Sequence, residues 1–96
     1  MRVDRRHARQ RRRRLERLER LSGWTIPEYV VICESKGQNL PPNYADASGY
    51  YQILGSTWTA YGGPPPAEAY LHSKYEQGVV AARIWREGGP SQWVCA

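Results

Sequence analysis

Glu34 is the side chain whose type and position best suit acid–base chemistry. It ends an apolar run and directly follows Cys33, one of only two cysteines in the 96-residue sequence. In the last turn of a helix, a carboxyl group lies near the negative end of the helix dipole, which disfavours its ionised form. Apolar neighbours disfavour ionisation further, and a carboxyl group that keeps its proton can act as a general acid. The alternative is a solvated Glu at the end of a surface helix, which is the commoner situation for this residue type.

A short helix is expected to position this carboxylate, running from about residue 26 to residue 35. Thr25 and Glu28 are spaced as a capping box, and Pro27 suits the first turn of a helix. Gly37 suits the end of the helix, because glycine readily adopts positive φ. The apolar stripe, at spacings of three and four, comprises Ile26, Tyr29, Val30 and Cys33.

A second segment, over residues 47–58, carries a recognisable pattern. The sequence reads C-E-S, then G-Y-Y-Q-I-x-x-S-T-W, then G-G, and finally W-x-C. In this order and spacing, the motifs resemble the transglycosylase-like domain of resuscitation-promoting factors, and more loosely goose-type lysozymes and soluble lytic transglycosylases. The nearest variants expected are small lysozyme-like modules of actinobacteria and their phages. The resemblance covers residues 24–95 and implies a lysozyme-like α+β fold, mainly helical with a short irregular β-hairpin, that cleaves the β-1,4 bond between N-acetylmuramic acid and N-acetylglucosamine.

The resemblance also implies roles for individual residues. Glu34 matches the catalytic acid of the family, and Cys33 and Cys95 match its disulfide pair. Gln52 matches a glutamine that lines the sugar cleft, and Trp58 matches the tryptophan six residues later. Further substrate contacts are expected from Asn39, Tyr50 and Tyr51.

The chain departs from the family pattern at three positions. The family's C-E-S-G-G-N-W reads here C-E-S-K-G-Q-N-L, so Lys36 replaces a glycine and Leu40 stands where an aromatic residue is usual. Leu54 stands where resuscitation-promoting factors tend to have a threonine. These departures concern the contacts with individual sugars, and they leave the acid in place.

The number of catalytic carboxylates bears on the reaction. Glycoside hydrolysis usually takes two carboxylates, and Asp46 is the acid nearest to the motif besides Glu34. A turn-capping role for Asp46 is the alternative. The resemblance implies a single Glu, which in lytic transglycosylases serves the attack of the muramic acid 6-hydroxyl on C1. No cofactor and no metal are expected, because His7 and His72 lie far apart in the sequence and cannot form a ligand cluster with these cysteines.

Two further elements are expected around the motif. Tyr44 to Leu54 is expected to form the hairpin, with its turn at residues 45–49. Ser73 and Glu76 form a second capping box that opens a helix to about Arg86. The stripe expected on this helix comprises Tyr75, Val79, Ala82 and Arg86, widened by Val80 and Ile84.

Charge divides the chain into a basic arm, residues 1–21, and a lysozyme-like domain, residues 22–96. Residues 1–20 hold ten Arg and three acids, a net of +7, and residues 21–96 hold four basic residues and six acids, a net of −2, which sum to +5. The arm, with a helix over residues 14–21, could bind anionic wall polymers, lipid headgroups or nucleic acid, or could be a solubilising extension. The competing hypotheses for the whole chain are therefore a nucleic-acid binder and a non-catalytic wall-binding module. A monomer is expected in each case.

The site of action follows from the resemblance and from the cysteines. Peptidoglycan lies outside the cell, and two cysteines that bracket a folded segment favour an oxidising compartment. A bridge between them would contribute about 4 kcal/mol in the chain-entropy model. No apolar segment that could serve as a signal peptide follows the basic residues. The sequence therefore predicts either delivery by a phage or a fragment of a longer protein.

Overall fold

A computed structural model describes Arg13 and residues 23–96 of the chain. The helix predicted over residues 14–21 and the rest of the basic arm lie outside the described residues, so binding by the arm stays a prediction. The elements, in order, are α2 Glu28–Ser35, β1 Ala47–Ser48, β2 Ile53–Leu54, α3 Gly55–Ala60, η1 Ala69–Leu71, α4 Lys74–Gly88 and η2 Pro90–Gln92, where η marks a 3₁₀ helix. The predicted α+β fold, mainly helical with a short hairpin, is confirmed. Within the described residues, no helix is long and apolar enough to cross a membrane.

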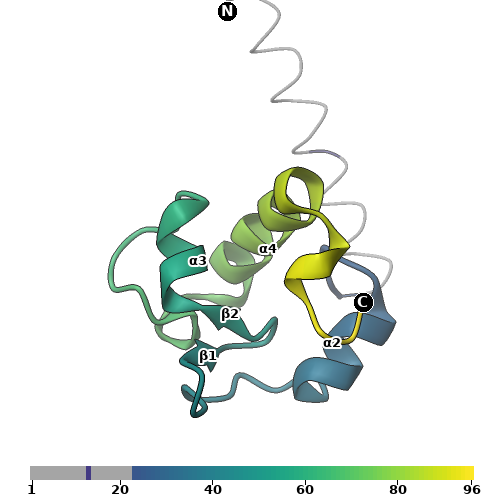
Figure 1. Cartoon of the computed structure of the whole chain (residues 1–96), viewed down its shortest axis with the longest axis horizontal. Coiled ribbons are helices and arrows are strands. Elements are labelled where there is room, and N and C mark those ends of the chain that lie inside the picture. Colours follow the sequence, from purple (N-terminus) through teal and green to yellow (C-terminus); the bar gives the residue numbers. More distant parts are fainter. Residues whose placement is uncertain (1–12, 14–22) are drawn as a thin grey trace, which may run out of the picture.

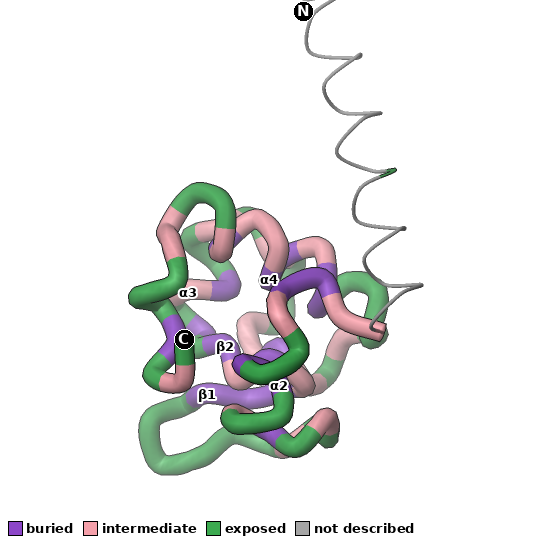
Figure 2. Tube along the Cα trace, turned by 90° about the vertical axis from the view of Figure 1, so that its right-hand side faces the viewer, coloured by how far each residue is buried: buried purple, intermediate pink, exposed green. Residues whose placement is uncertain are grey.

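Helix α4 is the centre of the domain. The two-stranded sheet and α3 lie on one side of it, and α2 and the C-terminal segment lie on the other (Figure 1). The buried segments converge on this helix and on β1 (Figure 2). The apolar core combines residues from every part of the described domain: Ile26, Val30, Val31, Tyr51, Ile53, Trp58, Ala69, Val80, Ala81, Ile84 and Trp93.

Helix α2 begins later than the capping pattern predicts. Pro27 occupies the N-cap position, and no side chain caps the helix. Thr25 is instead buried, and its hydroxyl donates to the carbonyl oxygen of Gly78 at 2.6 Å. The predicted capping box is therefore wrong, because a partner 53 residues away takes the hydroxyl. The end of the helix is as predicted, with Lys36 at φ 56° and Gly37 at φ 74°.

The buried face of α2 also differs from the predicted stripe. Val30, Val31 and Ser35 are the buried residues of the helix, while Tyr29 is 61% exposed and Cys33 is exposed. The predicted stripe is right for Ile26 and Val30, which are buried in the core, and wrong for Tyr29 and Cys33.

The hairpin is shifted relative to the prediction. Ala47 pairs with Leu54 and Ser48 with Ile53, so residues 49–52 form the turn and residues 45–49 do not. Gln52 makes this turn possible by adopting φ 51°, and its Nε2 donates to the Gly49 carbonyl oxygen at 2.9 Å. Within the hairpin predicted over residues 44–54, only Ile53 and Leu54 form the second strand, because this local side-chain bond closes residues 49–52 into a turn.

Helix α4 begins where the capping box predicts and ends two residues after the predicted end. The Ser73 hydroxyl accepts from the Glu76 N–H at 3.1 Å, which is the capping bond of the motif. Of the predicted stripe, Val80 and Ile84 are buried, whereas Val79 and Ala82 are only half-buried and Tyr75 is 48% exposed. The buried residues of the helix are Gln77, Gly78, Val80, Ala81 and Ile84.

Candidate active site

Three segments far apart in the sequence meet around Glu34. The disulfide between Cys33 and Cys95, whose Cα atoms are 6.0 Å apart, joins the end of α2 to the segment after η2. The Cys95 N–H donates to Oε2 of Glu34 at 3.2 Å. The Glu34 side chain is half-buried. The carboxylate is therefore held from the side of the C-terminal segment while part of its surface faces solvent.

The hairpin turn is the third segment, and two hydrogen bonds fix its backbone. Oγ of Ser35, the residue after Glu34, donates to the Tyr50 carbonyl oxygen at 2.6 Å. The indole N–H of Trp93 donates to the Tyr51 carbonyl oxygen at 2.7 Å. Adjacent carbonyl groups of one turn are thus held by the helix that carries the carboxylate and by the C-terminal segment.

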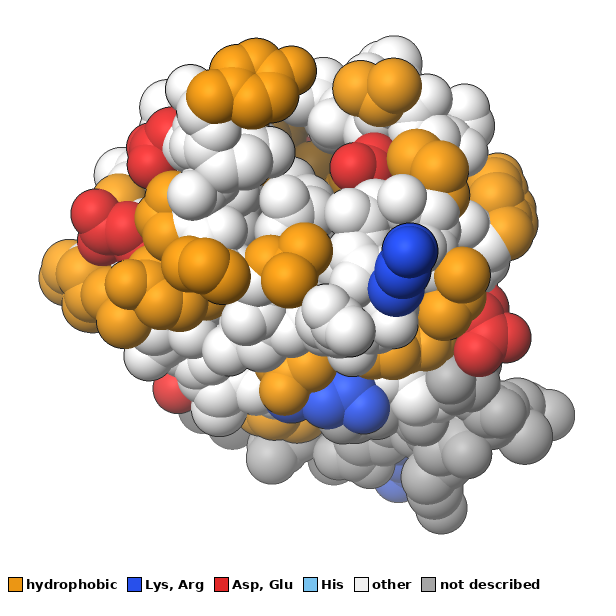
Figure 3. Space-filling model, turned by 90° about the horizontal axis from the view of Figure 1, so that it is seen from below, with side chains coloured by type: hydrophobic (Ala, Val, Ile, Leu, Met, Phe, Trp, Pro, Cys, Tyr) orange, Lys and Arg blue, Asp and Glu red, His pale blue; other side chains and the backbone are white. Residues whose placement is uncertain are grey.

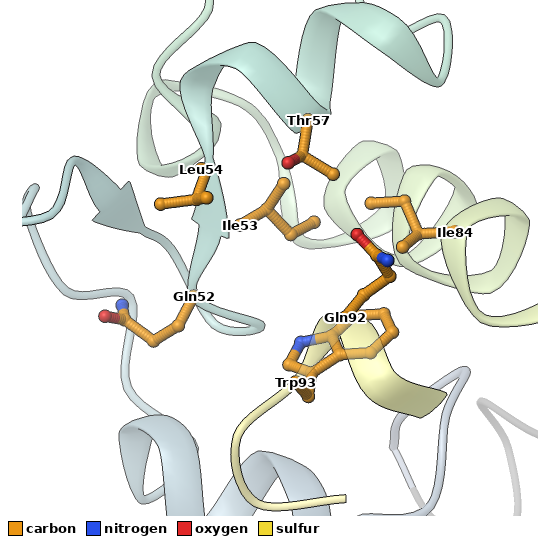
Figure 4. Close-up of a pocket in the computed structure, with 7 residues that line it drawn as sticks. All are labelled: Gln52, Ile53, Leu54, Thr57, Ile84, Gln92 and Trp93. Atoms are coloured by element: carbon orange, nitrogen blue, oxygen red, sulfur yellow. The ribbon is translucent and has the colours of Figure 1, made fainter. Parts of the chain in front are cut away.

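Gln52 lies at the end of this turn and lines a groove that continues away from it. The wall of the groove runs along β2 and α3 on one side and η2 on the other (Figure 4). Its lining residues are Gln52, Ile53, Leu54, Thr57, Ile84, Gln92 and Trp93. None of the seven carries a charge; Ile53, Ile84 and Trp93 are buried apolar residues, and Gln52, Thr57 and Gln92 supply polar groups. Such a groove suits a neutral ligand with both apolar and hydrogen-bonding groups.

Two of the predicted substrate contacts lie in the core. Tyr51 is 1% exposed and Trp58 is 0% exposed. The Trp58 indole donates to the Pro64 carbonyl oxygen at 2.7 Å, and its ring stacks on His72 with centroids 4.6 Å apart. Neither ring offers a surface to a sugar, and both belong to the apolar core.

Tyr50 and Asn39 are more accessible, and one residue holds both. Tyr50 is half-buried and packs against Trp24 with ring centroids 5.9 Å apart. Asn39 is exposed, and its amide nitrogen donates to the Tyr70 carbonyl oxygen at 3.0 Å. Oε1 of Gln77 accepts from the Tyr50 N–H at 2.9 Å, and its Nε2 donates to Oδ1 of Asn39 at 3.1 Å. Sequence reasoning missed Gln77, since it falls between the residues of the predicted stripe on α4.

Asp46 lies beside the start of α3. It is exposed at φ 65°, and a Cβ atom built on Gly55 would lie 2.8 Å from its Oδ2. The carboxylate of Asp46 is therefore packed close to Gly55, which follows β2, and not in the hairpin turn at residues 49–52.

The three residues that depart from the family pattern lie in different parts of the domain. Lys36 is exposed at the end of α2, and Leu40 is half-buried and pairs through its backbone with Gly49. Leu54 is 39% exposed and lines the groove. Of the three, Leu54 is the one that presents an apolar side chain where the family tends to have a hydroxyl.

The surface near α2 and the sheet is largely uncharged. Seen from below, this face shows apolar side chains in small groups between uncharged ones, with Asp and Glu side chains at both sides, a further acidic side chain set in from the upper edge, and few Lys or Arg among the described residues (Figure 3). Among residues 13 and 23–96, no three His, Cys, Asp or Glu side chains gather in a way that could hold a metal ion.

Comparison with known families identifies the class. The family model described as Transglycosylase-like domain matches residues 10–96. Searches of curated proteins and of solved structures gave no match. Because the family model covers most of the sequence, the chain belongs to the transglycosylase-like domain family. This membership indicates a lytic transglycosylase type of enzyme, peptidoglycan as its substrate and the cell wall as its place of action.

Proposed function

We propose that this domain cleaves the β-1,4 bond between N-acetylmuramic acid and N-acetylglucosamine, with Glu34 as its single catalytic acid and base. The observation that carries the proposal is the hydrogen bond from the Cys95 N–H to Oε2 of Glu34, in a side chain that is still half-exposed. One oxygen is held by the protein, and Oε1 is the atom that we assign to proton transfer. A carboxyl group that is positioned by the protein and still accessible supports a role in general acid–base catalysis, and the neutral groove lined by Gln52 and Trp93 is proposed to bind the glycan.

The reaction proposed has two proton transfers through the same group. In the first, protonated Glu34 gives its proton to the glycosidic oxygen, and the bond between this oxygen and C1 of muramic acid breaks. In the second, the 6-hydroxyl of the same sugar forms a bond to C1 while its proton moves to the Glu34 carboxylate. The products are a free 4-hydroxyl on N-acetylglucosamine and a 1,6-anhydro sugar. Glu34 is regenerated in its protonated form.

Neutral side chains are proposed to place the substrate. Nε2 of Gln52 is used by the Gly49 carbonyl oxygen at 2.9 Å, while Oε1 accepts only a long contact of 3.5 Å from Asn43. This oxygen can therefore accept from a sugar hydroxyl or from the N–H of an N-acetyl group. Tyr50 and Asn39 would contact the glycan strand on the neighbouring side of the hairpin turn.

Product analysis tests the proposal. Purified peptidoglycan would be digested with the wild type, with Glu34→Gln and with Glu28→Gln, and the fragments identified by mass spectrometry. Glu28 is the matched control, because it lies exposed at the opposite end of α2. We expect anhydro-muropeptides from the wild type and Glu28→Gln, and a rate for Glu34→Gln lower by about 10²–10⁴-fold.

Two results would contradict the proposal. Full activity of a folded Glu34→Gln variant would remove Glu34 from the mechanism. Reducing ends in place of anhydro sugars would mean that water attacks C1, and Asp46 would then become the residue to test as the second carboxylate.

A further inference from the structure

Gln77 is a fully buried amide whose hydrogen bonds all lead away from its own helix. It is 0% exposed and lies in the first turns of α4. Its Oε1 accepts from the Tyr50 N–H at 2.9 Å, and its Nε2 donates to Oδ1 of Asn39 at 3.1 Å and to the His72 carbonyl oxygen at 2.9 Å. One side chain therefore uses its acceptor and both amide protons on three separate partners.

The backbone around Gln77 leaves room for this amide. Gly49 lies directly against it, and a Cβ atom at Gly49 would collide with Oε1 of Gln77. Gly49 adopts φ 84°, so glycine is suited to this position by conformation as well as by space. The turn and the amide are therefore fitted to each other.

The partners of Gln77 connect it to the proposed site by a short path. Tyr50 donates its N–H to Gln77 and accepts at its carbonyl oxygen from Ser35, the neighbour of Glu34. The amide nitrogen of Asn39 donates a hydrogen bond to the Tyr70 carbonyl oxygen. The distance between the Asn39 side chain and the Tyr50 backbone is consequently set by one amide group that solvent does not reach.

We propose that Gln77 is a positioning residue that fixes Asn39 and Tyr50 on one wall of the sugar site, an inference that rests on the proposed glycan cleavage. Gln77 has no exposed surface, so it acts on the substrate only through these two residues. A buried amide whose donors and acceptor are all hydrogen-bonded has one orientation. This orientation fixes the positions of the Asn39 side chain and the Tyr50 backbone. Loss of the amide therefore changes how the glycan is held more than it changes the proton transfer at Glu34.

A matched pair of variants tests this role. Gln77→Met keeps the length of the side chain and removes its hydrogen bonds, whereas Thr25→Val removes the buried hydroxyl bond to the Gly78 carbonyl oxygen on the same helix. Both variants are expected to lower the melting temperature. Only Gln77→Met is expected to raise KM for a soluble glycan oligomer, by about tenfold, with kcat changed by less than about twofold. An unchanged KM, or an equal rise in Thr25→Val, would overturn the inference.

A double-mutant cycle with Asn39→Ala examines the path of the effect. If Gln77 acts through Asn39, the rise in KM of the double variant is smaller than the product of the two single effects. Multiplicative effects would overturn the assignment to Asn39. Should Gln77→Met fail to fold, Gln77→Asn replaces it, since Asn keeps a neutral amide in the buried position but is one methylene shorter and cannot keep the hydrogen bonds to both Tyr50 and Asn39.

A binding measurement separates this inference from the proposed function. Titration of an N-acetylglucosamine–N-acetylmuramic acid oligomer into Glu34→Gln, with and without Gln77→Met, gives Kd without turnover. Glu34-dependent cleavage with an unchanged Kd would reject only the role of Gln77. A tenfold weaker Kd together with no cleavage by either the wild type or Glu34→Gln would reject the catalytic proposal and support Gln77 as a positioning residue for glycan binding.

Discussion

Trp93 and Trp58 are both buried and make similar hydrogen bonds, but these bonds join different segments of the chain. They are 5% and 0% exposed, and each donates its indole N–H to a backbone carbonyl oxygen at 2.7 Å. The acceptor of Trp93 is Tyr51, 42 residues away in the hairpin turn, and the acceptor of Trp58 is Pro64, only six residues away. Burial and bond length therefore do not distinguish a residue that holds the site from one that holds a loop. The segment to which the acceptor belongs makes this distinction.

The neighbours of the two indoles extend the contrast. Trp58 stacks on His72, whose Nε2 lies 2.7 Å from the Pro66 carbonyl oxygen and whose Nδ1 lies 3.3 Å from Oε2 of Glu76, so the ring contacts of this cluster stay within residues 58–76. Trp93 lies two residues before Cys95 and packs against Trp85 of α4. The Trp58 region is thus stabilised by local contacts, and the Glu34 region by contacts between distant parts of the chain.

Removal of the disulfide should have the largest effect, because it opens the region of distant contacts. The bridge spans 62 residues, and a loop of this size contributes about 4 kcal/mol in the chain-entropy model. We expect a Cys33→Ser, Cys95→Ser variant to lose about this much free energy of unfolding, measured by urea denaturation. Below its melting temperature it should also lose activity, since the Cys95 N–H is no longer held at Glu34. Equal stability with and without a reducing agent in the wild type would contradict this prediction.

Replacement of each tryptophan by phenylalanine tests the comparison directly. Trp93→Phe and Trp58→Phe remove the same atoms and leave one buried carbonyl oxygen without its partner, at a cost of about 1–3 kcal/mol each. We expect similar losses of unfolding free energy, measured by denaturation. Only Trp93→Phe should lower kcat/KM on soluble peptidoglycan fragments, because only its acceptor belongs to the hairpin turn. Equal kinetic losses in both variants would show that the two regions are not independent.

Two serine variants should give the smallest effects and sharpen the same contrast. Ser35→Ala removes the bond to the Tyr50 carbonyl oxygen beside Glu34, and Ser73→Ala removes the N-cap of α4. Each should lower the unfolding free energy by about 1 kcal/mol. The kcat of Ser35→Ala should fall by a few fold, measured on the same fragments, while that of Ser73→Ala stays at the wild-type value. A larger kinetic loss in Ser73→Ala would contradict the assignment of the site to the hairpin turn.

Local signals in the sequence were sufficient for elements whose contacts are local. Ser73 and Glu76 predict the start of α4, and the capping bond between them is present in the structure. The same kind of signal at Thr25 failed, because its hydroxyl bonds to Gly78 in another element. A capping pattern is therefore informative only where no distant acceptor competes for the hydroxyl.

Apolar spacing predicted only part of the buried helix faces, because it identified Val30, Val80 and Ile84 but not the polar Gln77. Gln77 is buried because its three partners come from residues 39, 50 and 72, none of which a helical period can reveal. Tyr51 and Trp58 have the residue types that bind sugars, but the same types also fill small cores. The family motifs located Glu34, Gln52 and the cysteines, while the contacts that place them required the structure.

The bond between the Cys95 amide and Glu34 has a consequence for biosynthesis. The two residues are 61 positions apart, and a ribosome adds about 5–20 residues per second. The indole of Trp58 can meet Pro64 almost as soon as both have emerged, whereas Glu34 waits roughly several seconds for its partner to be translated. During synthesis, the loop around Pro64 can therefore form early. The Glu34 carboxylate lacks its hydrogen-bond partner until Cys95 has been translated.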